Sequence, residues 1–137
     1  MSTESSTLKQ LQQQLEKEAQ SYRELQQELG AYQSSHQQYQ QQKSENDMVL
    51  SELNSLDDSA SVFKQVGPAL LKQDPVEAKS NVSKRLEYIN SELTRLNSHI
   101  SSIESKQSCK QSDITKLQNR IQSLAQRSQP PQHPQPP

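Results

Sequence analysis

The chain is poor in the side chains from which globular cores are built. It has no tryptophan and one phenylalanine, and hydrophobic residues make up 28% of its 137 residues. Ordinary globular domains are about 45–50% apolar, so this composition excludes a single sizeable core. A coiled coil remains possible, because it requires apolar residues at only about two positions in seven.

Other scarce features narrow the class of protein further. The one cysteine, Cys109, excludes an intramolecular disulfide. No apolar run approaches the ~20 residues of a membrane-spanning helix. Residues 1–7 lack the basic and apolar regions of a secretory signal. We therefore expect no membrane partner and a cytoplasmic or nuclear location.

An excess of charge of one sign is also missing. The 15 basic and 16 acidic residues give a formal net charge of -1. They are mixed along the chain and form no basic patch of the kind that nucleic-acid binding needs. The sequence has no glycine-rich phosphate loop, no metal-ligand spacing and no nucleophile with an evident base. We expect no nucleic-acid partner, no cofactor or metal, and no enzymatic activity.

What the sequence does have is an unbroken heptad pattern over residues 8–57. A sustained period of 3.5 residues predicts a helix that packs along a partner helix, and the spacing defines a seam. Three polar residues toward the middle of it either fix the register or contact a partner: His36, Lys43 and Asn46. The seam consists of Leu8, Leu11, Leu15, Glu18, Tyr22, Leu25, Leu29, Tyr32, His36, Tyr39, Lys43, Asn46, Leu50, Leu53 and Asp57.

A second heptad seam follows in the C-terminal half and mirrors the first about Gly67-Pro68. Leu11 and Leu124, for example, lie nearly the same distance from that dipeptide. Mirrored seams are what an antiparallel pair of helices requires. The seam consists of Val82, Leu86, Ile89, Leu93, Leu96, Ile100, Ile103, Gln107, Lys110, Ile114, Leu117, Ile121 and Leu124.

Between the two seams lies a short segment with strand character. Residues 62–66 and 69–71 are rich in β-formers and are separated by Gly67-Pro68, which marks a turn. Because an isolated hairpin is marginally stable, we expect hairpins of several chains to pair; folding of the hairpin onto its own helices is the alternative. The expected assembly residues are Val62, Phe63, Val66, Gly67, Pro68, Leu70 and Leu71.

The sequence thus predicts a mostly α fold, a long antiparallel two-helix coiled coil with a central β-hairpin. We expect a single domain over residues 1–128, with helices at about 5–57 and 75–128 and the hairpin at about 61–73. Asp74 suits an N-cap and Pro75 the first helical position. Residues 129–137, rich in proline and glutamine, predict a disordered or polyproline-II tail.

Three parts of the central region resemble β-class prefoldin subunits. Residues 44–53 resemble the end of the first helix of that family, residues 62–74 its hairpin, and residues 77–89 the start of its second helix. The specific likeness covers about residues 44–96. The outer arms share only the coiled-coil pattern, and the glutamine-rich first arm and the tail depart from the family.

The resemblance implies a prefoldin β-type fold and a role in a hetero-hexamer with other α- and β-class prefoldin subunits. It implies an ATP-independent, cytoplasmic co-chaperone that captures unfolded proteins such as actin and tubulin and delivers them to the cytosolic chaperonin. Fraying of the two helix ends would expose an apolar tip for client binding. The expected client-binding residues are Leu8, Leu11, Leu15, Leu117, Ile121 and Leu124.

Two simpler interpretations stand beside this one. The tip leucines could serve only to close the coiled coil. The whole chain could be a structural tether or scaffold, in which case a parallel dimer or a long rod is expected. The strand-like break at Gly67-Pro68 favours the hairpin, because a tether would continue its seam through it.

Overall fold

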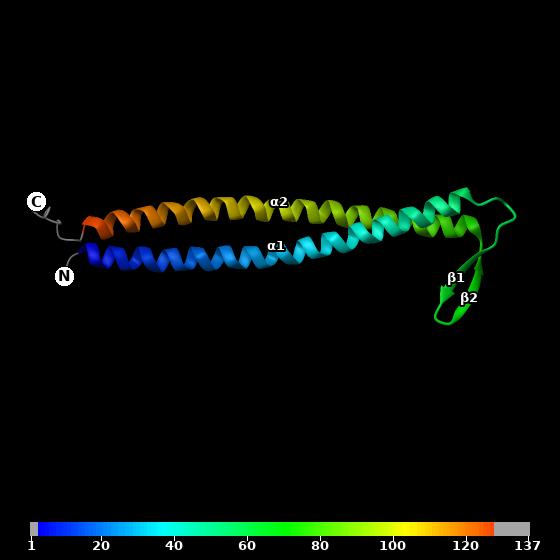
Figure 1. The fold of residues 1–137 in the computed structure, drawn as a ribbon, viewed down its shortest axis with the longest axis horizontal. Helices are drawn as coiled ribbons and strands as arrows, with labels where there is room; N and C mark the ends of the chain where they lie inside the picture. Colours follow the sequence, from blue (N-terminus) through cyan, green and yellow to red (C-terminus); the bar gives the residue numbers. More distant parts are fainter. Residues whose placement is uncertain (1–2, 128–137) are drawn as a thin grey trace, which may run out of the picture. The chain divides into compact units, whose positions relative to one another are not determined.

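The structure is a computed structural model that describes residues 3–127. Helix α1 spans Thr3–Ser55, strands β1 and β2 span Val62–Val66 and Ala69–Gln73, and helix α2 spans Pro75–Arg127 (Figure 1). The chain divides into two compact units. We name residues 31–100 the hairpin unit, and residues 3–30 with 101–127 the terminal unit.

The hairpin unit contains the two strands between the end of α1 and the start of α2 (Figure 1). Strand β1 pairs antiparallel with β2, from Val62 opposite Gln73 to Val66 opposite Ala69. The two-residue turn places Gly67 at a φ of 58°. Since proline holds a negative φ, Gly67-Pro68 forms a type II′ turn, which matches the twist of the strands.

Side-chain hydrogen bonds mark the two segments that connect the hairpin to α1 and to α2. After α1 ends at Ser55, the Asp57 carboxylate accepts hydrogen bonds from the Ser59 backbone amide (2.7 Å) and the Ser59 hydroxyl. Before α2, Asp74 Oδ1 accepts a hydrogen bond from the Val76 amide (3.2 Å), so Asp74 is the N-cap. Pro75 is then the first helical residue, where its missing N–H costs nothing.

The core of the hairpin unit lies along the predicted seam. Leu96 is its most buried large side chain, with 1% of its surface exposed. A cluster of Leu53, Ala78, Val82 and Leu86 closes the seam next to the hairpin, and Val62 packs against it. The Tyr32 ring stacks on that of His99, with centroids 5.1 Å apart.

The terminal unit contains the first part of α1 and the last part of α2, with their part of the predicted seam. Leu11, Leu29 and Ile103 are buried in it. Its polar seam residues meet partners: Lys110 Nζ lies 2.8 Å from Glu18 Oε2, and Gln107 Nε2 donates to Gln26 Oε1 at 2.6 Å. Among the described residues, every buried side-chain nitrogen or oxygen has a hydrogen-bond partner.

The predicted fold class is confirmed. Every predicted seam position from Leu8 to Leu53 and from Val82 to Leu124 is buried or partly buried. Asp57 is the exception: it is exposed because α1 ends two residues earlier, at Ser55. The predicted tail at 129–137 lies outside the described residues.

Candidate functional site

The hairpin presents most of its apolar side chains to solvent. Alternation along the strands places Val66 and Leu71 on one face and Phe63 and Leu70 on the other. These four residues are exposed, Leu70 to 68% and Phe63 to 55%. Val62 differs from the other predicted assembly residues, because it packs against the helix core of its own chain. The hairpin is therefore anchored at Val62 and carries unpartnered apolar surface on both faces.

The edges of the hairpin are open as well. The sheet of the described residues has two strands, so each strand has one side without a neighbouring strand. The backbone N–H and C=O groups on that side are available to a strand from another chain. Open edges together with exposed apolar faces are the features of a surface that pairs with other hairpins.

The exposed apolar surface extends beyond the residues that sequence reasoning selected. In the described chain, the large apolar side chains that are exposed all lie between Met48 and Tyr88. Five of them are outside the strands. Their signal in the sequence is that they are apolar but off the heptad seam, and they are Met48, Val49, Leu56, Val76 and Tyr88.

The predicted client-binding residues come together in the terminal unit. Leu11 is buried with 6% of its surface exposed, and the other five are partly buried along the seam. They come from the first turns of α1 and the last turns of α2. In this structure they close the coiled coil, so client contact would require the two helix ends to separate.

A polar layer follows the tip leucines along the seam of the terminal unit. It consists of the Glu18–Lys110 ion pair and the Gln26–Gln107 hydrogen bond. The hydrogen bond to Glu18 is the main cause that raises the pKa of Lys110 above its ordinary value. The polar side chains interrupt the apolar seam between Leu15 and Tyr22 on α1 and between Ile103 and Ile114 on α2.

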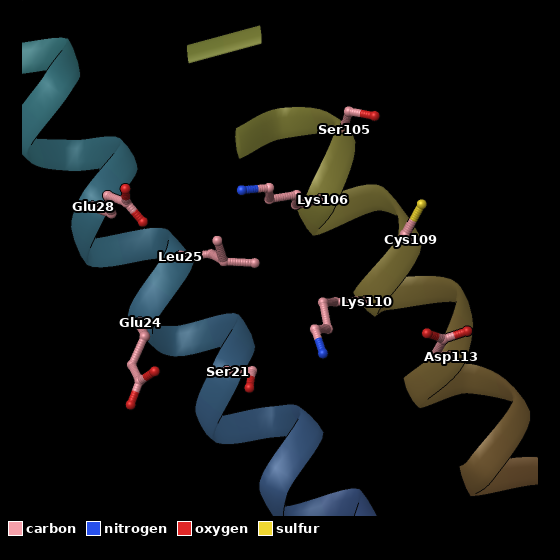
Figure 2. Close-up of a pocket in the computed structure, with 9 residues that line it drawn as sticks. All are labelled: Ser21, Glu24, Leu25, Glu28, Ser105, Lys106, Cys109, Lys110 and Asp113. Atoms are coloured by element: carbon pink, nitrogen blue, oxygen red, sulfur yellow. The ribbon is translucent and has the colours of Figure 1, made fainter. Parts of the chain in front are cut away.

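A hollow of about 430 Å³ lies beside this polar layer. In Figure 2, Leu25 extends from α1 toward α2, and Lys106 and Lys110 extend from α2 toward α1. Glu24, Glu28 and Asp113 also line it, so its charges are mixed. Cys109 lines the same hollow as an exposed free thiol.

The described residues hold no group of three or more His, Cys, Asp or Glu side chains that could bind a metal ion. Searched over the same residues, no helix is long and apolar enough to cross a membrane. His36, Lys43 and Asn46 lie partly buried on the seam as predicted. The Asn46 side chain donates to the backbone carbonyl of Gln42 at 2.7 Å, so its amide is bonded within its own helix.

Comparison with known proteins identifies the family. The model of the family described as "Prefoldin subunit" matches residues 16–128. The chain belongs to the prefoldin family. The resemblance seen in the central sequence, which within the β class pointed to prefoldin subunit 6, is thereby confirmed.

Prefoldin relatives of this chain match nearly its full length. Prefoldin subunit 6 of Arabidopsis thaliana is 42% identical over 120 residues, which cover 88% of this chain and 93% of that protein. Prefoldin subunit 6 of Bos taurus is 37% identical over 112 residues, covering 82% of this chain and 87% of that protein. Members of this prefoldin family are chaperone subunits and not enzymes.

The prefoldin fold is also recognised in solved structures. The prefoldin beta subunit from Thermococcus strain KS-1 superposes with a TM-score of 0.65 at 24% identity. That match covers 86% of this chain and 95% of the Thermococcus chain. At this identity the likeness establishes the shared fold: two helices joined through a β-hairpin.

Proposed function

We propose that this chain is a subunit of a hexameric, ATP-independent prefoldin co-chaperone in the cytoplasm. It would capture unfolded proteins, including actin and tubulin, and deliver them to the cytosolic chaperonin. The observation that carries the proposal is the anchored hairpin, whose two open edges and four exposed apolar side chains have no partner in the described chain. Prefoldin subunits assemble with other prefoldin subunits, and this surface suits that purpose.

The proposed assembly residues are those of the hairpin. Edge-to-edge pairing with hairpins of α- and β-class subunits would satisfy the free backbone groups of β1 and β2. It would also cover Phe63, Val66, Leu70 and Leu71. Gly67 and Pro68 set the turn that keeps the two strands in register.

The proposed client-binding residues are the six tip side chains of the terminal unit. Separation of the first turns of α1 from the last turns of α2 would expose six apolar side chains that face one another on the seam when it is closed. Several such weak clamps in one hexamer gain avidity through effective concentration. The Glu18–Lys110 ion pair supports this proposal. It interrupts the apolar seam, so fewer apolar contacts have to be lost when the two helix ends separate.

Native mass spectrometry after co-expression with α- and β-class prefoldin subunits tests the assembly. We expect a hetero-hexamer that contains one copy of this chain. A homodimer that does not bind those subunits would contradict the proposal and favour a structural tether.

Client capture needs a separate test within the assembled complex. A variant with Leu8, Leu15 and Leu124 changed to Ser is expected to assemble but to suppress aggregation of unfolded actin less well. The matched control changes three exposed polar residues of the same unit, Gln10, Gln13 and Gln122, to Ser. Equal suppression by the tip variant and the control would argue against tip binding.

A further inference from the structure

A basic groove lies between the hairpin and α2 in the hairpin unit. Its wider part, about 470 Å³, is lined by Lys64, Asn81, Lys84, Arg85 and Tyr88. Lys64 comes from β1 and the other four from α2. A narrower part of about 210 Å³ shares Lys64, Asn81 and Arg85 with it, so the two hollows form one groove.

The groove combines a positive rim with an apolar floor. Its lining includes three cationic side chains and no carboxylate. The narrower part adds aliphatic residues of the helix core and the ring of Phe63. An apolar centre with a polar rim is the usual anatomy of a protein–protein interface.

Within the described residues, the three cations of the groove form no ion pair. Within residues 3–127, a carboxylate oxygen lies within 4.0 Å of Arg95 and of Lys110, but of neither Lys64, Lys84 nor Arg85. Three like charges around one hollow repel one another and attract a negatively charged partner. The groove is therefore electrostatically suited to carboxylates from another chain.

An exposed aromatic side chain stands at the rim. Tyr88 exposes 60% of its surface, although its ring forms an edge-to-face pair with that of Tyr39, with centroids 6.4 Å apart. Hydrogen bonding with Tyr88 is the main cause that raises the pKa of Tyr39. Tyrosines that are held on one side and open on the other are enriched at interfaces.

We propose that this groove receives an acidic segment, carrying an apolar anchor side chain, from the neighbouring subunit of the prefoldin assembly. The inference rests on the proposed function and adds a second contact to it. Continuity favours a neighbouring subunit as the source, because Phe63 and Lys64 belong both to the groove and to the hairpin that pairs. A subunit docked edge-on to β1 would lie beside Lys64, which is on that strand and lines the groove. The apolar anchor would cover the floor while its carboxylates meet Lys64, Lys84 and Arg85.

Charge reversal tests the groove in the co-expressed complex. Lys84→Glu with Arg85→Glu is expected to lower incorporation of this chain about tenfold or more at low salt, since attraction becomes repulsion. The difference should shrink as salt is raised, because the charges are screened. The matched control, Lys106→Glu with Lys116→Glu, makes the same charge change on exposed positions of the terminal unit. Incorporation of the groove variant equal to that of the control would overturn the proposal.

Zero-length cross-linking identifies the occupant. A carbodiimide joins lysine amines to carboxylates in direct contact, so Lys64 and Lys84 of the wild-type complex should link to Asp or Glu of a neighbouring subunit. Links only within this chain, or only to an added client protein, would overturn the assignment. A wild-type chain that forms no hetero-complex refutes the proposed function itself. If incorporation is lost on changing the hairpin but is unaffected by reversing the groove charges, this inference alone is refuted.

Discussion

Two aspartates placed on the hairpin should prevent assembly while leaving the helices intact. In the Phe63→Asp, Leu71→Asp variant, one charge falls on each face of the hairpin. Neither side chain contributes to the helix core, since Phe63 is 55% and Leu71 is 54% exposed. We therefore expect helical content by circular dichroism to remain close to that of the wild type.

The size of the effect follows from those exposed fractions. The exposed fractions of the two side chains add up to about one whole side chain. Burying that surface in an interface is worth about 1.5–3 kcal/mol. The two carboxylates add a desolvation penalty of several kcal/mol per ion if they enter the same interface. Because about 1.4 kcal/mol corresponds to a factor of ten, assembly should weaken more than about 1,000-fold.

The assay is native mass spectrometry or size exclusion of the co-expressed complex. The matched control places the same two charges at exposed helix positions of the hairpin unit, as Gln38→Asp with Ser91→Asp, and should assemble normally. A full-size complex at normal abundance with the hairpin variant would refute the reasoning, because no covered hairpin surface could hold two unpaired carboxylates.

Three further predictions concern stability, pH and the tip. Leu96→Ala should lower the free energy of unfolding by about 2–5 kcal/mol in a urea titration, because the removed side chain is 1% exposed; Leu56→Ala, at an exposed position, should change it little. The hydrogen bonds from Ser59 lower the pKa of Asp57, so they stabilise the linker above the ordinary aspartate pKa of about 3.9 and this contribution is lost as the pH falls through the lowered value. An NMR titration of Ser59→Ala should show the pKa of Asp57 rise, and an unchanged pKa would contradict the assignment. Glu18→Leu with Lys110→Leu should extend the apolar seam through the polar layer, slow hydrogen exchange in the last turns of α2 and reduce client capture; unchanged exchange and capture would show that the layer does not limit tip opening.

The heptad seams account for most of what could be read from the sequence. Apolar side chains spaced 3.5 residues apart can be buried only along one stripe of a helix, so Leu11, Leu53 and Leu96 had to face a partner helix. The Gly67-Pro68 dipeptide fixed the turn, because one residue admits a positive φ and the other demands a negative one. These local rules also placed Asp74 and Pro75 at the start of α2.

The candidate surfaces were predicted only in part, for a related reason. Phe63 and Leu71 stood out because they are apolar in a segment too short to have its own core. Met48 and Val76 are more exposed still but lie inside helical patterns. Their position off the heptad seam is a signal, but it does not tell whether another element covers them. The exposure of a side chain depends on what packs beside it, and a single helix does not contain that information.

The sequence by itself determined the two helices, the seam that joins them, the hairpin between them and the family. Only the tertiary structure decided which residues meet across the seam, as Glu18 meets Lys110 and Gln26 meets Gln107. It also decided that Lys64 of β1 lines the same groove as Lys84 and Arg85 of α2. Periodicity specifies the face of a helix on which a side chain lies, whereas a partner on another element depends on the register and on the path of the chain between the elements.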